Sequence, residues 1–241
     1  MAFDTLDNET LSSRVSRELI RSIVSGRFSP YDLLPTEEQL CGEFGVSRSV
    51  VREAMKVVTG IGMARSRQGQ GTVVLSTASW NNFSAELIQA RRDTGTMHDV
   101  LSEVLELRGI IEVQAAGLAA IRGSEENFDE LAGLLERMQA AVGEPVAFIA
   151  LDLEFHTEIL RASANHLIVS LFGLLAPALT AAREIGLDGQ PQPQGMRRAI
   201  EEHVRILATL RTGSAPHTEQ AMREHLAAAA ERVARGRSAR N

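Results

Sequence analysis

The sequence is poor in cysteine, in aromatic residues and in long uncharged stretches. Cys41 is the only cysteine among 241 residues, so no disulfide can form within the chain. The longest stretch without Lys, Arg, Asp or Glu runs from Ala162 to Ala182, and Asn165, Gly173 and Pro177 interrupt it. Such interruptions favour a buried helix pair over a membrane span. We therefore expect that this is not an integral membrane protein.

The sequence also lacks a secretory start and the short motifs of several enzyme classes. Its first ten residues, MAFDTLDNET, carry acidic side chains where a signal peptide has a basic start and a long apolar run. It contains no Gly-x-Ser-x-Gly elbow, no phosphate-binding loop and no His-Glu-x-x-His helix. These absences predict a cytoplasmic protein and disfavour the enzymes that such motifs mark.

The net charge of −6 is distributed unevenly along the chain. Residues 1–77 hold nine basic and nine acidic side chains, so the rest of the chain carries the whole negative charge. Within residues 45–71, four arginines and Lys56 stand against Glu53 alone, which gives a local charge of +4. A small basic patch on an acidic protein is a candidate contact for nucleic acid.

Length and composition predict two folded domains. Apolar residues make up 44% and charged residues 23% of the chain, close to globular averages. A chain of 241 residues fits two domains of ordinary size. We place the first over residues 8–76 and the second over residues 80–236. Residues 76–79 are small and polar and form the predicted linker, so Trp80 and Phe83 begin the second domain.

The first domain has the pattern of three short helices. Apolar residues at helical spacing predict a first helix over residues 11–24. Thr36 and Gln39 have the spacing of a capping box, which opens a second helix. Ser47 is a good N-cap for a third helix, which stops at Gly60.

A tight turn and a hairpin complete this domain. Gly45 ends the second helix, and two helices joined by such a turn are a helix-turn-helix candidate. Residues 62–67 and 72–75 are short strand candidates, joined by the glycine-rich loop 68–71. The hairpin would be the wing of a winged helix-turn-helix.

The third helix carries arginines at the end that a recognition helix uses. Arg48 and Arg52 are one turn apart and project from one face, near the hydroxyls of Ser47 and Ser49. Arginine recognises guanine edges, and serine hydroxyls bind phosphates. Exposed arginines alone are better explained as a solvated helix face. Together with the tight turn and a hairpin that carries Arg67, they favour DNA binding.

Three blocks of this domain resemble the winged helix-turn-helix of GntR-type bacterial transcription regulators. The blocks are Leu34–Leu40, Phe44–Ala54 and Arg67–Val73, in the order and spacing of the family. Glu38 departs from the family, which often has an arginine there. The resemblance implies that the third helix and the wing tip face an operator. It assigns this role to Ser47, Arg48, Ser49, Val50 and Arg52 in the helix and to Gln68 and Gly69 in the wing, beside Arg67.

The second domain is predicted to be an all-α antiparallel helical bundle. Apolar residues recur at helical spacing, with Gly, Pro or Asn at most junctions and no alternating strand pattern. The predicted helices cover residues 97–122, 125–142, 145–163, 166–185, 194–211 and 215–236.

Arg108 lies in the middle of an apolar helical stripe that includes Val104 and Ile111. A guanidinium keeps its proton, so a buried one needs an anionic partner. That partner is either a protein carboxylate, Glu112 or Glu154, or the acid group of a ligand. The residues themselves leave these alternatives open.

Three histidines and one aspartate lie at the apolar-facing edges of three predicted helices. Asp152 and His156 are one helical turn apart, and His203 and His225 lie on the last two helices. Any one of these histidines is better explained as an ordinary core or surface imidazole. As a set they are the ligands that a helix bundle uses for a divalent transition metal. The sequence therefore predicts a metal site, with zinc as the first choice and nickel or manganese as alternatives.

The second domain resembles the FCD effector domain of the FadR branch of GntR regulators. The signature of that domain includes an Asp-x-x-x-His pair and two later histidines, which Asp152, His156, His203 and His225 match. Arg108 matches the family arginine that binds an effector carboxylate. The resemblance implies a homodimer that binds a short inverted repeat, contains a metal and is released from DNA by a small organic acid. Trp80 and the residue after it weakly resemble members that sense sugar acids.

Two alternatives remain beside a ligand-responsive regulator. A metal-dependent hydrolase would use the ion to activate water, and His98 with Asp99 matches the dyad of HD-type phosphohydrolases. That family needs a further histidine upstream, whereas His98 is the first histidine of this chain. The other alternative is a DNA-binding regulator whose metal is purely structural. We expect a regulator and not an enzyme.

Overall fold

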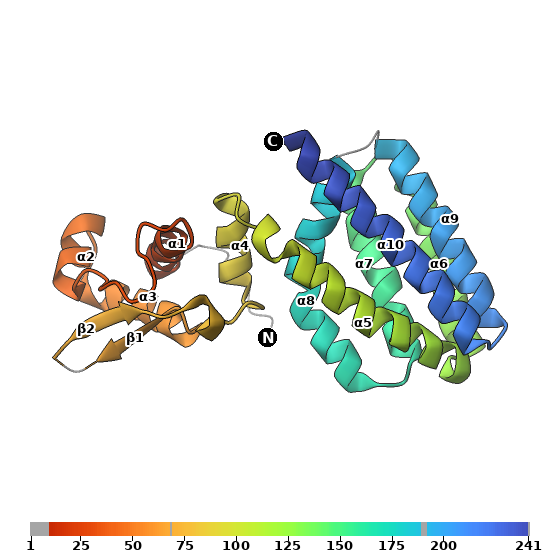
Figure 1. The fold of residues 1–241 in the computed structure, drawn as a ribbon, viewed down its shortest axis with the longest axis horizontal. Coiled ribbons are helices and arrows are strands. Elements are labelled where there is room, and N and C mark those ends of the chain that lie inside the picture. The colour runs from red at the N-terminus through yellow and green to blue at the C-terminus, as the bar shows by residue number, and fades with distance from the viewer. Residues whose placement is uncertain (1–9, 68, 189–191, 241) are drawn as a thin grey trace, which may run out of the picture. The chain divides into compact units, whose positions relative to one another are not determined.

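The part of the chain that the structure describes is mainly α-helical and forms two compact units (Figure 1). The first unit extends to Met97, and the second begins at His98. The predicted fold class is confirmed, with a small winged domain followed by a helical one. The computed structural model describes residues 10–67, 69–188 and 192–240, and the side chains of 185–192 and 235–241 lie outside the description.

Three helices with side-chain caps form the body of the first unit. Thr10 and Ser47 each accept a hydrogen bond from the backbone of the helix that follows. Thr36 and Gln39 form the predicted capping box, which satisfies backbone donors at the start of the second helix. The helices are α1 (Leu11–Val24), α2 (Glu37–Phe44) and α3 (Arg48–Gly60).

The turn between α2 and α3 depends on one glycine. Gly45 has φ +63°, a left-handed conformation that is unfavourable for most L-residues. The backbone N–H of Val46 donates to the carbonyl of Cys41 at 3.2 Å, which closes the end of α2. Ser47, the N-cap of α3, lies two residues after Gly45, and the N-terminal end of α3 is exposed.

A two-stranded antiparallel hairpin follows α3, as predicted. Strands β1 (Ala64–Arg67) and β2 (Gly71–Val74) pair with Ala64 opposite Val74. Leu33, in the loop before α2, adds an antiparallel bridge to Val73. This bridge ties the hairpin to the helical body of the unit.

The predicted linker, residues 76–79, belongs to the first unit. Most of it is a short 3-10 helix, η1 (Thr77–Ser79). Trp80 follows and is only 9% exposed. Its indole N–H donates to the carbonyl of Leu75 at 3.1 Å. A buried tryptophan with a satisfied N–H anchors this stretch to the hairpin.

Helix α4 (Ala85–Asp93) completes the first unit. Leu87 and Ala90 are fully buried and belong to the same apolar cluster as Trp80, together with side chains of α1 and α3. The boundary between the compact units therefore lies after Met97 rather than at the predicted linker. Trp80 does not begin the second domain, because its apolar surface is buried in the first.

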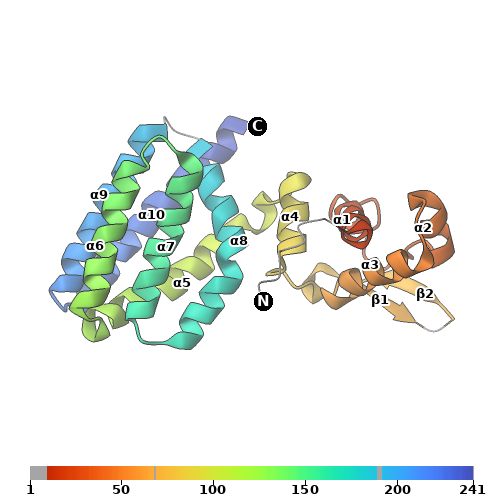
Figure 2. The same cartoon turned by 180° about the vertical axis from the view of Figure 1, so that it is seen from behind.

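In the described residues of the second unit, six helices pack together (Figures 1 and 2). Helix α6 packs on α7 and α9, and α10 packs on α5, α8 and α9. The predicted helical ranges match the observed ones closely. The helices are α5 (His98–Arg122), α6 (Glu125–Ala140), α7 (Pro145–Ala162), α8 (His166–Asp188), α9 (Gln192–Arg211) and α10 (Ala215–Arg240).

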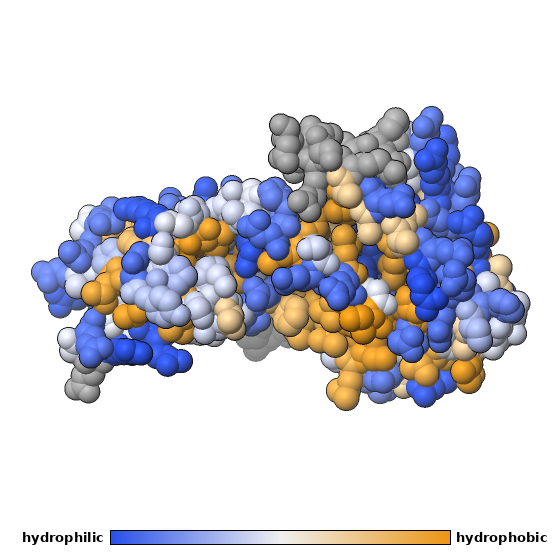
Figure 3. Space-filling model, in the orientation of Figure 1, coloured by the Kyte–Doolittle hydropathy of each residue, from blue (hydrophilic) through white to orange (hydrophobic). Residues whose placement is uncertain are grey.

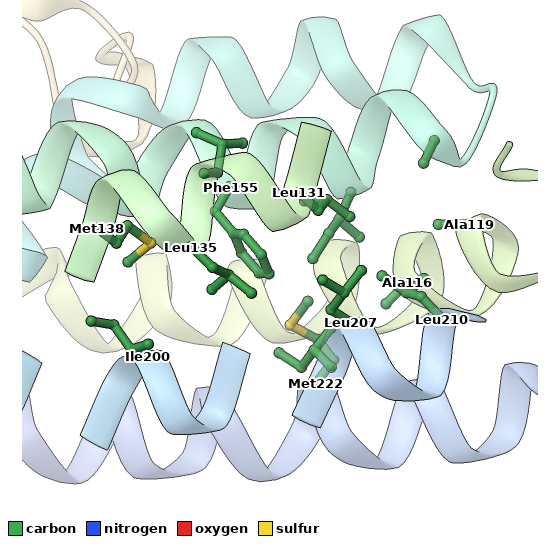
Figure 4. Packing of buried hydrophobic residues seen from close by; sticks show 14 of the residues in the cluster. Ala116, Ala119, Leu131, Leu135, Met138, Phe155, Ile200, Leu207, Leu210 and Met222 are labelled. Carbon is green, nitrogen blue, oxygen red and sulfur yellow. The ribbon is translucent and has the colours of Figure 1, made fainter. Parts of the chain in front are cut away.

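The main core of the second unit lies between α5, α6, α7, α9 and α10 (Figure 4). Phe155 of α7 and Met138 of α6 are fully buried, and they lie in one cluster with Ile200 of α9 and Met222 of α10. Ala116 of α5 keeps that helix close to the others. Each large apolar side chain buried here stabilises the fold by about 1.5–3 kcal/mol. This core fixes α7, α9 and α10, the helices that carry the predicted metal ligands.

Helix α8 is the one helix in the described residues that is long and apolar enough, by length and composition alone, to cross a membrane. A core helix passes the same test, so this is weak support for a span. The helix packs on α5, α7 and α10 and buries Phe172 and Leu179. Leu167 and Leu174 are exposed, and Figure 3 shows hydrophobic surface over the part of the helical unit where α8 and α5 lie. Its packing is that of a bundle helix with one apolar exposed face.

Candidate metal centre and nucleic-acid interface

The N-terminal end of α3 presents the predicted DNA-binding side chains. Arg48, Ser49 and Arg52 are exposed, and so is the cap residue Ser47. The hydroxyl oxygens of Ser47 and Ser49 lie 2.9 Å apart. Val50 is half-buried against the apolar cluster of the unit, so it anchors the helix as well as bordering this surface.

Arg52 is held by an acidic neighbour from the preceding helix. Its Nε donates to Glu37 Oε2 at 2.9 Å, and the two side chains are 65% and 44% exposed. An exposed pair of this kind is worth about 0–1 kcal/mol, so a DNA phosphate or base can replace the glutamate. Glu38, the residue after Glu37 on α2, is exposed as well.

The wing offers a second exposed basic element. Arg65 and Arg67 of β1 are exposed. Gly69 has φ +75°, a conformation that glycine adopts without strain and that the loop needs at this position. Gln68, which the sequence predicts at the wing tip, lies outside the described residues.

In the helical unit, three predicted metal ligands meet. His156 of α7, His203 of α9 and His225 of α10 are buried, with exposures of 0%, 0% and 3%. Their candidate ligand atoms all lie within 4.8 Å of one another. The Nε2 atom of His225 is 3.2 Å from that of His156 and 3.3 Å from that of His203. Three residues far apart in sequence thus converge on one point.

Burial keeps these imidazoles neutral. It lowers the pKa of His156 and the pKa of His203 below the usual range, and it lowers the pKa of His225 to about 4. A neutral imidazole has one N–H and one lone pair, so three converging nitrogens cannot all be satisfied by one another. A divalent transition metal would accept all three lone pairs, and the donor set fits such an ion.

Two carboxylates lie at the Nδ1 atoms of two of these histidines, on the side of the ring away from the Nε2 atoms that converge. Glu202 Oε2 lies 2.8 Å from the Nδ1 of His225, and Glu112 Oε2 contacts the Nδ1 of His156. A carboxylate that accepts the Nδ1 proton leaves the Nε2 lone pair free for a metal. The Nδ1 of His203 has no hydrogen-bond partner among the described residues. His225 is therefore preset in the tautomer whose Nε2 lone pair is available to a metal.

Asp152 lies beside the histidine group. Its Oδ1 is 3.5 Å from His203 Nε2, and its Oδ2 is 4.0 Å from His156 Nε2. Its Oδ2 also accepts a hydrogen bond from the Nε of Arg183 on α8. Burial alone would raise the pKa of Asp152, but the Arg183 guanidinium, the two histidines and Arg108 together outweigh it and hold that pKa well below its usual range. The carboxylate is ionised, with Oδ1 turned toward the histidines.

Arg108 bridges the histidine group and Glu112. Its Nε donates to Glu112 Oε1 at 2.5 Å, and its Nη2 lies 2.9 Å from His156 Nε2. Of the two carboxylates that the sequence left open, Glu112 is the partner. Glu154 is exposed and lies 3.6 Å from Arg137 instead. The guanidinium thus already has a protein anion, and its other end reaches the Nε2 of His156, a candidate metal ligand.

A cavity with a volume of about 60 Å³ lies next to this cluster. Five helices contribute to its wall, and much of the wall is apolar. A small concave site with a few convergent polar groups is typical of ligand binding. Its charged and polar lining residues are Arg108, Asp152, Arg183, His225 and Arg232.

Sequence reasoning missed several members of this cluster. Arg183 follows Phe172, Leu175 and Leu179 at helical spacing, so the apolar stripe that singles out Arg108 singles it out too. Glu202 has no such signal, because any acidic residue on an exposed helix edge looks the same. Arg232 donates to both carboxylate oxygens of Glu202 at 3.0 Å, a contact that only the packed helices create.

Comparisons with known proteins agree with both units. Residues 11–74 match the family of bacterial regulatory proteins called the gntR family, and residues 103–228 match the FCD domain. The uncharacterised HTH-type transcriptional regulator YieP of Escherichia coli K12 is 34% identical over 169 residues, 69% of this chain and 73% of YieP. LutR of Bacillus subtilis 168 is 29% identical over 85% of this chain and 92% of LutR. The galactonate operon transcriptional repressor of Escherichia coli K12 is 23% identical over 92% and 96%.

Solved structures share the fold. Lar, which controls the expression of the Listeria monocytogenes agr system, matches with a TM-score of 0.62 and 19% identity over 96% of this chain and 99% of Lar. Escherichia coli McbR/YncC matches with a TM-score of 0.52 and 19% identity over 97% of this chain and 100% of that protein. At this identity the likeness concerns the fold alone.

Proposed function

The chain belongs to the GntR family of bacterial regulatory proteins, and we propose that it is a transcriptional repressor that a small organic acid releases from DNA. Its relatives and its domains indicate a transcription regulator and not an enzyme. It binds a short palindromic operator as a homodimer, with one recognition helix in each half-site. The acid binds at the metal centre of the helical unit and changes the relative placement of the two winged domains.

One observation carries the proposal for the helical unit. Three buried Nε2 atoms converge within 4.8 Å, with Arg108 and the cavity beside them. A merely structural cluster would not need a cavity lined by guanidinium groups. Buried perturbed histidines at a cavity with convergent charged groups are instead typical of a ligand site.

The residues divide into two roles at this site. His156, His203 and His225 would hold the metal, with Asp152 as the carboxylate ligand and zinc, nickel or manganese as the ion. When bound, the ion supplies a Lewis-acidic attachment point for a carboxylate oxygen of the effector. Arg108 would bind the same carboxylate through its Nη2, which lies 2.9 Å from His156 Nε2.

The winged unit supplies the DNA contacts in this proposal. The recognition helix enters the major groove, and the wing tip enters the minor groove. Arg48 and Arg52 would recognise base edges, and the serine hydroxyls would bind phosphates. The DNA-contacting residues are Ser47, Arg48, Ser49, Val50 and Arg52 of the helix and Arg67, Gln68 and Gly69 of the wing.

The chemistry of one relative supports an acid as effector. The repressor that is 23% identical is named for the galactonate operon, and galactonate is a sugar acid. The hydrolase alternative gains no such support. His98 is exposed at the start of α5, and the histidine group is formed by three other residues. A sugar acid or another small carboxylate is therefore the proposed effector.

Release of DNA by an acid is the direct test of this function. A duplex selected from a random pool would be bound to the full-length, metal-loaded protein and titrated with sugar acids and short hydroxy acids at constant salt. We expect the effective acid to weaken DNA binding about 5–150-fold, the usual range of coupling between two sites. Chloride at equal ionic strength is the control, since phosphate contacts depend on salt. If metal and DNA bind but no acid changes the affinity, the metal is structural.

Arg52→Ala tests the interface on α3. We expect specific binding to weaken by about 1–3 kcal/mol, the cost of a lost bidentate base contact, while a scrambled duplex is bound as before. The loss of the exposed pair with Glu37 changes the free energy of unfolding by at most about 1 kcal/mol. Electrophoretic shift titrations on both duplexes measure the effect. Lys56→Ala, at an exposed position further along α3, is the matched control. Equal losses on both duplexes would make Arg52 a phosphate contact.

A further inference from the structure

The guanidinium group of Arg183 is buried, and its Nη2 donates no hydrogen bond within the described residues. The residue is 9% exposed and lines the cavity beside the histidines. Its Nε donates to Asp152 Oδ2, and its Nη1 donates to the carbonyl of Leu179 at 3.3 Å. Its Nη2 has no hydrogen-bond partner among the described residues. A buried guanidinium donor without an acceptor is costly, so its retention at a cavity wall points to an anionic ligand.

The charges around the cavity balance in pairs. Arg108 pairs with Glu112, Arg183 with Asp152, and Arg232 with Glu202, so these three pairs are neutral together. The three histidines are uncharged when they hold a metal, because a nitrogen that donates its lone pair to the ion carries no proton. Counting the described side chains that line the cavity and their ion-pair partners, a divalent ion at the histidine group would therefore leave two uncompensated positive charges in a largely buried site. Uncompensated buried charge is expensive, so a ligand with two negative charges suits the loaded site best.

We infer that Arg183 forms a second anion subsite and that the effector is a dianion, in chemical class a small dicarboxylate with or without hydroxyl groups. One carboxylate lies at the metal and Arg108, and the other accepts the Nη2 donor of Arg183. This inference rests on the proposed function, which concerns the first carboxylate alone. A monocarboxylate would leave the Nη2 donor of Arg183 unpaired and one positive charge uncompensated.

The position of Arg183 supports a separate subsite. It comes from α8, whereas Arg108 comes from α5, and Asp152 of α7 lies against Arg183. Burial and the nearby Arg108 guanidinium lower the pKa of Arg183, while Asp152 raises it, and an arginine stays protonated in either case. Guanidinium groups from two helices at one cavity can each bind one carboxylate of the same ligand.

Matched pairs of acids provide the test. Full-length zinc-loaded protein would be titrated calorimetrically with malate and 2-hydroxybutyrate, with succinate and butyrate, and with galactarate and galactonate. The members of each pair share a chain length and differ in the second carboxylate. We expect at least one diacid to bind ten- to a hundredfold more tightly than its monoacid partner. If every diacid binds no better than its partner, the inference is overturned and the proposed function stands. If neither class binds to zinc-loaded protein, the proposed function fails too.

Two variants at Arg183 assign the effect to this residue. Arg183→Gln should lower the affinity for the favoured diacid about ten- to a hundredfold and lower that for its monoacid partner much less. Because this change deprives buried Asp152 of its cation, zinc content and melting temperature are measured alongside. Arg183→Lys keeps the charge next to Asp152 and should retain part of the preference. An unchanged diacid preference in a folded, zinc-loaded Arg183→Gln protein would contradict the subsite.

Discussion

The variant His203→Ala/His225→Ala is expected to bind no divalent metal, whereas the wild-type protein is expected to bind about one ion per chain. The change removes two of the three imidazoles at this site. The Nε2 of His225 lies 3.2 Å from that of His156 and 3.3 Å from that of His203. His156 and Asp152 remain, but the Nε2 of His156 is 2.9 Å from the Arg108 guanidinium and Asp152 accepts a hydrogen bond from Arg183. One imidazole and one carboxylate, each beside a guanidinium group, do not hold a transition metal tightly at neutral pH. Elemental analysis after loading with zinc, nickel or manganese and gel filtration measures the content.

A matched control separates this effect from the loss of any two histidines. His166 and His217 lie on α8 and α10, like the ligands on bundle helices, but both are exposed. The variant His166→Ala/His217→Ala should keep the full metal content. Full metal content in His203→Ala/His225→Ala would refute the site as described.

Thermal melts show whether the double variant is folded. The change leaves no orphaned charge, since Glu202 keeps both hydrogen bonds to Arg232. Metal at a hundred times its dissociation constant stabilises a protein by about 2.7 kcal/mol. A chelator should therefore lower the melting temperature of the wild-type protein and leave that of the variant unchanged. A cooperative melt that does not respond to the chelator identifies a folded, metal-free protein.

Local signals made much of the fold predictable. The capping box of Thr36 and Gln39, the cap at Ser47 and the left-handed Gly45 all act within a few residues, and all are present in the structure. The long helices of the second unit follow from apolar periodicity over four or more turns. Such patterns are strong because the apolar residues of every turn lie on the same face of the helix.

The boundary between the units was not predictable in this way. Residues 76–79 look like a linker by composition, but Trp80 and Leu87 are buried against α1 and α3. That burial depends on how segments distant in sequence pack. Helix α4 is also short, so its periodicity gives little signal. A polar stretch before an isolated tryptophan therefore does not separate a linker from a loop of the same domain.

The convergence of three buried histidines was predictable from the sequence, and the residues that support them were only partly predictable. Histidines at apolar helix edges are unusual enough to notice, and Arg183 could have been found by the same criterion. The partner of Arg108 could not, since Glu112 at i+4 on the same helix and Glu154 on another helix are both acidic side chains that the sequence allows to reach it. Only the packing of α5 against α7 shows that Glu112 is fully buried next to His156, while Glu154 lies at the surface.

Arg108→Met should lower the free energy of unfolding by about 3–5 kcal/mol, the usual cost of removing one partner of a buried ion pair. Methionine preserves the apolar stem, so packing changes little. Glu112, however, is fully buried and loses its cation. We also expect the response to the effector acid to disappear, because the guanidinium beside His156 is the proposed carboxylate clamp. Chemical denaturation and calorimetric titration of the acid measure the two effects separately.

A second substitution distinguishes the stabilising role from the ligand role. Arg108→Met/Glu112→Gln removes the buried charge that the single change leaves behind. The amide oxygen of the new side chain can still accept the Nδ1 proton of His156. Most of the lost stability should return, whereas the acid should still fail to bind. If the double variant binds the acid with the affinity of the wild-type protein, Arg108 serves only to balance Glu112.

The pH dependence of the free energy of unfolding tests whether Arg108 stabilises the ionised Glu112 carboxylate. Burial alone would raise the pKa of Glu112, but Arg108 and then His156 outweigh it and lower that pKa from 4.5 to about 2. A carboxyl group with a lower pKa in the folded state stabilises the protein fully above pH 4.5 and loses this contribution as the pH falls toward 2. Without Arg108, the pKa of Glu112 rises and the contribution disappears. In metal-free protein, the difference in unfolding free energy between wild type and Arg108→Met should therefore be largest at neutral pH and shrink as the pH falls toward 2. A difference that stays constant down to pH 3 would show that the Arg108 guanidinium does not stabilise the ionised Glu112 carboxylate.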